Sequence, residues 1–255
     1  MRYVAIGDSF TEGLGDELPD GSVRGWADLV ATGLAAVAEG PMHYANLAVR
    51  GRLLAPVVTG QLEDALALSP APTLVTLNGG GNDMMRPRYD GTRLLRLTEQ
   101  AVRRCAGAGV QLVLISGADP TDRLPLGPLV HRRGADLTAR LADLADRHGL
   151  VFVDVFADPE IRRPDYWSPD RLHLGPAGHQ RVAGLVLAAL GHTAEAHLVD
   201  PGPAASRSLR VEAGWYREHV GPWLLRRVQR RPSGTGRTGK QLHWVEVAPA
   251  PQGQR

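Results

Sequence analysis

Residues 2–10 read RYVAIGDSF, an apolar run that ends in glycine, aspartate and serine. The run Tyr3–Gly7 has the length and composition of a buried strand. Four similar short runs follow it along the chain: His43–Val49, Thr73–Asn78, Val110–Ser116 and Leu150–Val155. Longer stretches with helical periodicity accompany them: Trp26–Ala38, Leu54–Leu68, Thr92–Ala106, Leu129–Arg147 and Pro176–Leu190. This alternation predicts a three-layer α/β/α, flavodoxin-like fold in which helices cover both faces of a five-stranded parallel sheet.

Polar clusters follow four of the five predicted strands. They are Asp8-Ser9 after the first strand, Arg50-Gly51 after the second, Asn82-Asp83 after the third, and Asp170 with His173 in the loop after the fifth. In open α/β sheets, ligands bind outside the carboxyl ends of the strands. We therefore expect these clusters, which are far apart in the chain, to converge on one rim of the sheet.

Ser9, His173 and Asp170 have the chemistry of an acyl-transfer site. A hydroxyl at a tight turn after a strand can act as nucleophile, an imidazole can take its proton, and a carboxylate can orient the imidazole. The spacing of Asp170 and His173 lets the carboxylate bind one ring nitrogen while the other nitrogen faces the serine. Each motif alone has a more ordinary interpretation, since Asp-Ser pairs often cap helices and D-x-x-H pairs can lie on the surface.

The negative oxygen that forms during acyl transfer needs hydrogen-bond donors. The candidates are the backbone amides of Ser9 and Gly51 and the side-chain amide of Asn82. Glycine permits close approach of the backbone to a substrate, and asparagine is a neutral donor. Asp8 and Asp83 are expected to accept backbone hydrogens and so to hold the turns that carry Ser9 and Asn82. On its own, the glycine-rich segment around Asn82 would be interpreted as a turn.

Taken together and in chain order, four segments resemble the sequence blocks of the GDSL/SGNH hydrolase family. They are residues 7–10 (GDSF), 46–51 (NLAVRG), 80–83 (GGND) and 170–173 (DRLH). The resemblance covers roughly residues 1–190 and includes the four residues for which SGNH is named: Ser9, Gly51, Asn82 and His173. The chain departs from the family pattern at Phe10, where the family name has leucine, and in the extension after Leu190.

The resemblance implies an esterase or lipase that cleaves carboxylic ester or related acyl bonds through an acyl-enzyme. In that pattern Ser9 is the nucleophile, His173 the general base and Asp170 its orienting acid, while Ser9, Gly51 and Asn82 form the oxyanion hole. The substrate would be a small-molecule acyl ester, and neither a metal nor an organic cofactor is implied. The alternative is a non-catalytic binding module on the same fold, with a basic tail that contacts an anionic partner.

The composition changes after about Leu190. We expect residues 1–192 to form the hydrolase domain and residues 193–255 to form a linker and an arginine-rich extension. Residues 201–255 hold 10 of the 29 basic residues but only 3 of the 27 acidic ones. The extension is predicted to contain a basic amphipathic helix at Leu209–Arg231 and a strand-like run at His243–Val247. Lys240 is the only lysine of the chain, which indicates a compositional preference for arginine, so a nucleic-acid partner is not expected.

Other features concern location and substrate. No stretch approaches ~18 consecutive apolar residues, and the chain enters its first strand at Arg2, so we expect a cytoplasmic protein without a transmembrane segment. Cys105, the single cysteine, is interpreted as a packing residue. The loops Arg86–Asp90 and Ala118–Pro128 indicate an open cleft with selectivity for an anionic group. The acyl chain, the leaving group and the oligomeric state stay open.

Three further features have weaker functional interpretations. Asp154 ends the fifth predicted strand and is a less favourable orienting acid than Asp170. His179 lies on another face of the last helix and is interpreted as a structural or surface residue. Residues 234–240 read GTGRTGK and match the start of a phosphate-binding P-loop, but Gln241 stands where serine or threonine is needed and no apolar strand precedes them.

Overall fold

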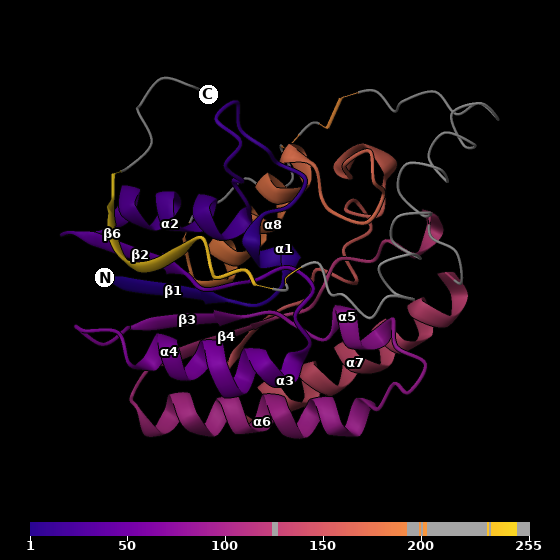
Figure 1. Ribbon diagram of the computed structural model, residues 1–255, viewed down its shortest axis with the longest axis horizontal. Helices are drawn as coiled ribbons and strands as arrows, with labels where there is room; N and C mark the ends of the chain where they lie inside the picture. Colours follow the sequence, from indigo (N-terminus) through magenta and orange to yellow (C-terminus); the bar gives the residue numbers. More distant parts are fainter. Residues whose placement is uncertain (124–126, 193–198, 200, 203–233, 235, 249–255) are drawn as a thin grey trace.

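A computed structural model of the chain describes residues 1–123, 127–192, 199, 201–202, 234 and 236–248. In this part of the chain the strands form one six-stranded sheet with the order β5-β4-β3-β1-β2-β6. Helices lie on both faces of the sheet, which gives three layers (Figure 1). The predicted α/β/α class is therefore confirmed. The helix predicted at Leu209–Arg231 lies outside the described residues.

The five predicted strands are all present and parallel to one another. They are β1 (Arg2–Ile6), β2 (Met42–Asn46), β3 (Leu74–Leu77), β4 (Gln111–Ile115) and β5 (Val151–Val153). Their spatial order, 2-1-3-4-5, is the flavodoxin-like order. The central strand β3 is buried at every position, as expected for a parallel strand covered on both faces.

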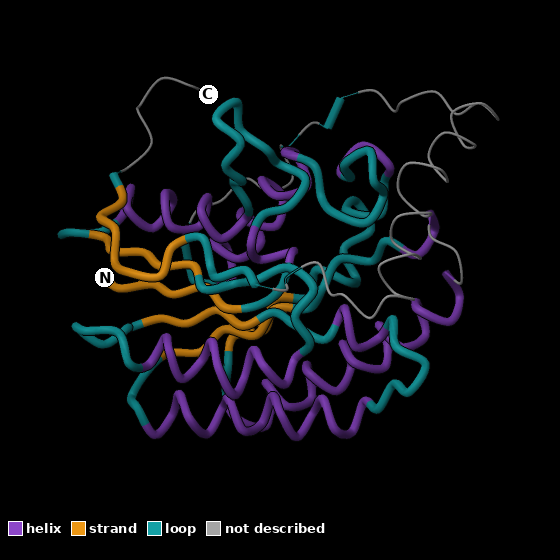
Figure 2. Tube along the Cα trace, in the orientation of Figure 1, coloured by secondary structure: helices purple, strands orange, loops and turns teal. Residues whose placement is uncertain are grey.

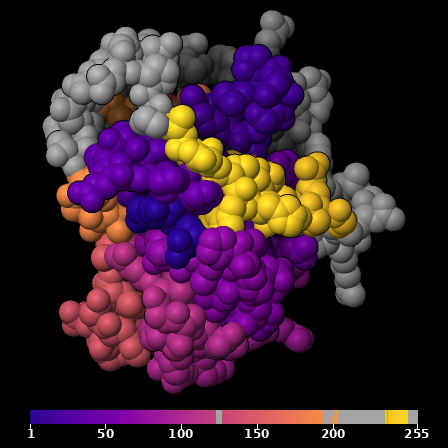
Figure 3. Space-filling model, turned by 90° about the vertical axis from the view of Figure 1, so that its left-hand side faces the viewer, coloured from indigo at the N-terminus to yellow at the C-terminus, as the bar shows by residue number. Residues whose placement is uncertain are grey.

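A sixth strand, β6 (Gln241–Val247), pairs with β2 in antiparallel orientation, with Tyr44 opposite Val245. The five predicted parallel strands are thus joined by a sixth, antiparallel one, so the predicted number of strands in the sheet is one too low. The physical reason is that β2 would otherwise leave its outer N–H and C=O groups unpaired at the edge of the sheet. The strand-like run predicted at His243–Val247 fills that edge, and Figure 3 shows this C-terminal segment, in yellow, across the surface of the domain.

The helices divide between the two faces of the sheet (Figure 1). On one face, α2 (Trp26–Val37) and α8 (Pro176–Ala189) pack together over an apolar cluster that includes Tyr3 and Val113. On the other face lie α3 (Leu54–Pro56), α4 (Leu62–Leu66), α6 (Gly91–Gly107) and α7 (Gly127–His148). The remaining elements are α1 (Ser9–Glu12), α5 (Gly81–Met84), η1 (Val57–Gln61), η2 (Thr121–Arg123) and η3 (Pro164–Tyr166).

The predicted helix Leu54–Leu68 contains a π-helical turn, η1, between α3 and α4. Such turns add a residue to a helix and often occur at functional sites. At the end of η1, the side-chain amide of Gln61 accepts the N–H of Gly7 (2.8 Å) and donates to the carbonyl oxygen of Gly7 (3.0 Å). The irregular helix therefore carries the side chain that holds the end of β1.

The loops at the carboxyl ends of the parallel strands gather at one end of the sheet (Figure 2). They line an open cleft of about 1330 Å³ that includes residues from all four predicted polar clusters. Among its lining residues are Ser9, Gly51, Asn82, Asp170 and His173. The structure thus brings the sequence-predicted residues to one cleft at the expected end of the sheet.

Candidate active site

Ser9 is the first residue of α1 and follows β1 after a two-residue turn formed by Gly7 and Asp8. The turn requires glycine at position 7. A Cβ atom there would lie 2.6 Å from Oγ1 of Thr11 and 2.7 Å from the carbonyl oxygen of Asn78, which is closer than real Cβ contacts allow. The missing side chain at Gly7 therefore lets α1 begin only two residues after β1, with Ser9 at the cleft.

A hydroxyl, an imidazole and a carboxylate form a continuous chain at this cleft. Nε2 of His173 lies 3.0 Å from Oγ of Ser9, and Nδ1 of the same ring lies 2.6 Å from Oδ2 of Asp170. Both distances are those of hydrogen bonds. A carboxylate beside Nδ1 favours the tautomer with a proton on that nitrogen, which leaves the lone pair of Nε2 facing the serine. This arrangement can take a proton from the hydroxyl and stabilise the imidazolium that results.

The turn around Asp170 holds its carboxylate in place. Oδ1 of Asp170 accepts hydrogen bonds from Oγ of Ser168 (2.7 Å) and from the backbone N–H groups of Leu172 and His173 (2.9 Å each). Burial raises the pKa of Asp170, but the hydrogen bonds and the charge of His173 outweigh this effect and hold that pKa well below its ordinary value. Arg171, within the same turn, has a φ of 61°, the one positive φ of a non-glycine residue in the described ranges. This conformation costs about 1 kcal/mol or more, so the contacts of the turn must impose it.

Asn82 and Gly51 border the cleft from two other loops. Nδ2 of Asn82, in α5, donates hydrogen bonds to Oδ2 of Asp8 and to the carbonyl oxygen of Arg52, each at 3.0 Å. Gly51 has a φ of 75°, a left-handed conformation that favours glycine. The side-chain amide of Asn82 and the backbone of Gly51 thus lie along the cleft that contains Ser9.

The carboxylates of Asp8 and Asp83 link these loops to neighbouring backbone. Oδ1 of Asp8 accepts the N–H of Phe10 (3.2 Å), and Oδ2 of Asp83 accepts the N–H of Leu54 (2.9 Å). Burial raises the pKa of Asp8 to about 6, although its hydrogen bond from Phe10 acts in the opposite direction. Burial also raises the pKa of Asp83. The two contacts join the Ser9 turn to its own helix and the Asn82 turn to α3.

An ion pair between Glu12 and Arg50 was not anticipated from the sequence. Glu12 is only 7% exposed, and its carboxylate accepts hydrogen bonds from Nε of Arg50 (2.9 Å) and from the Arg50 backbone N–H (2.6 Å). Because Arg50 directly precedes Gly51, this pair fixes the Gly51 loop relative to α1. Glutamate is almost never buried without a partner, so its burial explains why the pairing is needed.

His179 is fully buried in α8. Nδ1 of its ring accepts the backbone N–H of Trp26 (3.2 Å), and Nε2 donates to the carbonyl oxygen of Leu14 (3.0 Å). Burial lowers the pKa of His179 to about 4, so its ring is neutral at physiological pH. The residue is therefore structural and not at the surface: it connects the loop after α1 and the start of α2 to the helix that follows His173.

Replacement of His179 with glutamine is expected to reduce the loss of unfolding free energy that accompanies a fall in pH below neutrality. In the unfolded chain this ring takes a proton near pH 6.5, whereas in the folded protein it does so only near pH 4. The unfolded state therefore binds more protons between these values, and the wild type loses about 2–3 kcal/mol of unfolding free energy through His179 between pH 7.5 and 4.5. Urea denaturation of both proteins across this range measures the difference.

The raised pKa of Asp8 makes the folded protein more stable as the pH falls, which opposes the effect of His179. Asp8 is present in both proteins, so the difference between variant and wild type reports the contribution of His179. His179→Gln should also lose about 1–3 kcal/mol at pH 7.5, because glutamine fills the buried site less well. His148→Gln, at an exposed position of α7, is the matched control and should keep the wild-type slope. Equal slopes for His179→Gln and the wild type would contradict the assignment.

Two other sequence features lie elsewhere. Oδ1 of Asp154 accepts hydrogen bonds from Oγ of Ser116 (3.3 Å) and from the N–H of Ala157 (3.0 Å), so Asp154 stabilises the loop after β5. The carboxylate that contacts His173 is that of Asp170.

In the P-loop-like stretch 234–240, Nζ of Lys240 lies 2.6 Å from Oδ2 of Asp28. That lysine is occupied by an internal ion pair, which agrees with the rejection of a phosphate-binding loop.

The sequence matches the family of GDSL-like lipases and acylhydrolases over residues 5–181, more than half of the chain. No curated protein matches it. Within the described residues, no helix is long and apolar enough to cross a membrane.

Several solved structures share the fold. The acetylxylan esterase Axe2 from Geobacillus stearothermophilus, solved as a catalytic mutant, is 18% identical and superimposes with a TM-score of 0.62 over 80% of this chain and 97% of its own. The psychrotrophic esterase EstA from Pseudoalteromonas sp. is 16% identical, with a TM-score of 0.58 over 74% of this chain and 96% of its own. LAE5, an alpha/beta hydrolase from the metagenome of Lake Arreo, Spain, is 23% identical, with a TM-score of 0.58 over 74% and 94% of the two chains. At these identities the likeness concerns the fold.

Proposed function

Because this chain belongs to the GDSL-like lipase/acylhydrolase family, we propose that it is a serine hydrolase that cleaves carboxylic esters or related acyl bonds, with Ser9 as its nucleophile. The observation that carries the proposal is the continuous hydrogen-bonded chain from Ser9 through His173 to Asp170 at the cleft. Acyl transfer needs this combination of a hydroxyl, a base and an orienting acid.

The proposed reaction has two halves. Oγ of Ser9 attacks the acyl carbon while Nε2 of His173 takes the hydroxyl proton, and Asp170 stabilises the imidazolium. The bond to the leaving alcohol then breaks, and the alcohol departs with that proton, which leaves the acyl group on Ser9. Water attacks the acyl-enzyme with His173 again as base, the carboxylic acid is released, and Oγ of Ser9 regains a proton. No cofactor is needed for these steps.

The oxyanion of each tetrahedral intermediate would bind the backbone N–H groups of Ser9 and Gly51 and the side chain of Asn82. In the structure, the two hydrogens of Asn82 Nδ2 are directed to Asp8 and to the carbonyl oxygen of Arg52. A charged oxygen is a stronger acceptor than a peptide carbonyl, so we expect it to displace the Arg52 oxygen from one of these hydrogens. The bond to Asp8 keeps the amide oriented meanwhile.

Hydrolysis of p-nitrophenyl esters with acyl chains of two to twelve carbons tests this function. We expect turnover by the wild type, with a chain-length profile that separates an acetylesterase from a lipase-like enzyme. Asn82→Ala should lower kcat about 10²–10³-fold on the preferred ester, because one oxyanion donor is lost. Gln100→Ala, which removes an exposed amide from α6, is the matched control and should keep wild-type activity.

Wild-type turnover with an unaltered kcat for Asn82→Ala would contradict the role of Asn82. Absence of turnover on every chain length would favour the alternative, a non-catalytic binding module. The geometry argues against that alternative, because a binding module has no need of a serine hydroxyl, an imidazole and a carboxylate within hydrogen-bonding distance of one another. A cytoplasmic location and the absence of a nucleic-acid partner stay predictions.

A further inference from the structure

The C-terminal segment contributes to the wall of the proposed active-site cleft. Residues 234 and 236–240 pass along the loop that follows β2, which carries Gly51. A Cβ atom at Gly234 would lie 2.1 Å from the carbonyl oxygen of Arg50, and one at Gly239 would lie 2.6 Å from Cα of Leu47. The segment is therefore in direct backbone contact with this loop at two points. Arg237, between them, lines the cleft together with Ser9 and Gly51.

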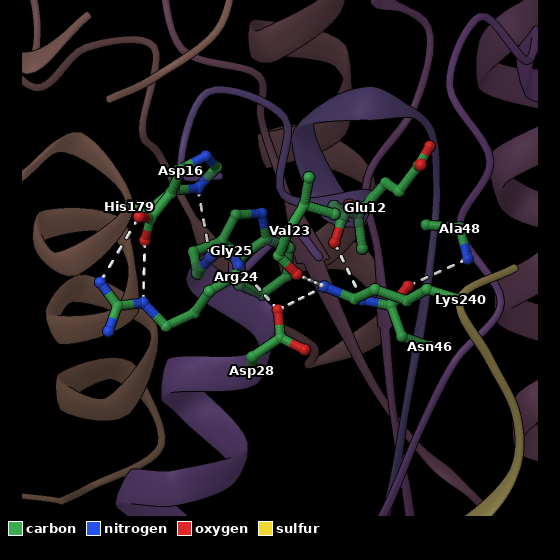
Figure 4. Close-up of polar contacts among 12 residues, drawn as sticks. Glu12, Asp16, Val23, Arg24, Gly25, Asp28, Asn46, Ala48, His179 and Lys240 are labelled. Atoms are coloured by element: carbon green, nitrogen blue, oxygen red, sulfur yellow. Dashed lines mark hydrogen bonds and ion pairs between the residues drawn. The ribbon is translucent and has the colours of Figure 1, made fainter. Parts of the chain in front are cut away.

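Several contacts fix this segment on the domain. β6 continues the sheet along β2 immediately after Lys240. Nζ of Lys240 donates to Oδ2 of Asp28 (2.6 Å) and to the carbonyl oxygen of Val23 (2.9 Å), as Figure 4 shows. On the other side, the N–H of Arg237 donates to the carbonyl oxygen of Gly234 (3.1 Å) and forms a turn. The backbone of Arg237 is thus held from both sides.

Within the described ranges, the guanidinium of Arg237 forms no hydrogen bond or ion pair with another side chain. Arg237 is exposed, and no acidic side chain in the described part of the chain forms an ion pair with it. By contrast, Arg50 in the same cleft is neutralised by the buried Glu12. Of the described residues that line the cleft, Arg86 is the other exposed cation. It lies in the connection after β3, whereas Arg237 lies beside the loop after β2. Because β1 is between these two strands, Arg86 and Arg237 are on opposite sides of the Ser9 turn.

We infer that Arg237 is a substrate-binding residue that favours esters bearing a carboxylate or another oxyanion remote from the scissile bond. The inference rests on the proposed function and adds its substrate class. Arginine presents a planar fork of donors that matches an oxyanion in two parallel hydrogen bonds. The sequence alone indicated anionic selectivity from the loops Arg86–Asp90 and Ala118–Pro128, whereas the structure assigns it to the C-terminal segment.

The test compares kcat/KM for matched charged and neutral esters. Two charged substrates distinguish the position of the anion: p-nitrophenyl hemisuccinate carries it on the acyl group, and 4-butyryloxybenzoate carries it on the leaving group. p-Nitrophenyl butyrate and 4-butyryloxybenzamide are their neutral references. We expect the wild type to prefer one charged ester, and Arg237→Gln to lower that charged-to-neutral ratio about tenfold with little change on the neutral ester.

Three further variants and a change in salt concentration make the result specific. Arg237→Lys should keep part of the preference, because it retains the charge but not the fork. Arg96→Gln, at an exposed position of α6, changes the net charge equally and should keep the wild-type ratio. Arg86→Gln should also keep that ratio. Raising the salt concentration from about 0.05 to 0.5 M should weaken the preference of the wild type and leave Arg237→Gln nearly unaffected.

Each contrary outcome has a distinct meaning. Hydrolysis of neutral esters with the same charged-to-neutral ratio in the wild type and in Arg237→Gln would overturn the inference while leaving the proposed function intact. A lower charged-to-neutral ratio in Arg86→Gln, with an unchanged ratio in Arg237→Gln, would place the anion site at the Arg86 loop and would also overturn the inference. Failure of the wild type to hydrolyse any ester, neutral or charged, would overturn the proposed function and the inference with it.

Discussion

Ser9→Ala is expected to lower kcat for ester hydrolysis by a factor of up to about 10⁶. The variant loses the oxygen that would form the acyl-enzyme, and no other hydroxyl contacts Nε2 of His173 among the described residues. Any residual rate would come from direct attack by water on a bound ester whose oxyanion is still stabilised by the remaining donors. In serine hydrolases this residual rate is about 10³–10⁴-fold above the uncatalysed reaction. Steady-state kinetics on the preferred p-nitrophenyl ester measures the effect.

The fold should be preserved in this variant, because alanine is compatible with the first turn of α1 and Asp8 still caps the helix. Thermal unfolding within a few degrees of the wild type would show this. Ser22→Ala is the matched control and should keep full activity, since among the described residues the exposed Ser22 hydroxyl forms a hydrogen bond with Asp20 alone. Retention of wild-type kcat by Ser9→Ala would rule out Ser9 as the nucleophile.

His173→Ala is expected to lower kcat by a similar factor, up to about 10⁶, because the serine loses its general base. The residues of such a site act as a unit, so the double variant Ser9→Ala with His173→Ala should be no slower than either single variant. Asp170→Asn should cost less, about 10⁴, because it changes the tautomer of the imidazole and leaves the ring in place.

The pH profile separates a catalytic His173 from a structural one. As a general base, His173 must be neutral to accept the proton of Ser9, so the activity of the wild type should fall in acid. Asp170 stays ionised there, since its pKa is held far below its ordinary value. His179→Gln keeps His173 and should show the same pH profile of kcat. Near wild-type activity of His173→Ala would contradict the account.

The layers and the location of the cleft could be predicted from the sequence, because both follow from local patterns. Runs such as Tyr3–Gly7 and Thr73–Asn78 are short and apolar, and parallel strands must expose their carboxyl ends together. Once the sheet is assumed, Ser9 and His173 are expected at the same rim although the chain separates them by 164 residues. The direction and partner of β6 could not be predicted, because they depend on which edge strand the distant C-terminal segment reaches.

The supporting contacts of the site were harder to predict. Gln61 was not singled out in the sequence: its spacing places it on the apolar face of its helix, but nothing local shows that its partner is the backbone of Gly7. His179 also follows the spacing of the apolar residues Val182 and Val186, so the same signal was present. In both residues the pattern indicates burial, while the identity of the partner depends on tertiary packing.

Labelling with a fluorophosphonate tests most directly the claim that Ser9 is an activated nucleophile. The reagent forms a stable bond only with a serine whose proton is removed by a nearby base. We predict one phosphonyl group per chain, located by peptide mass spectrometry on the peptide that contains Ser9, and no labelling of Ser9→Ala or His173→Ala. Labelling of another serine, or none in a wild-type protein that hydrolyses esters, would contradict the account.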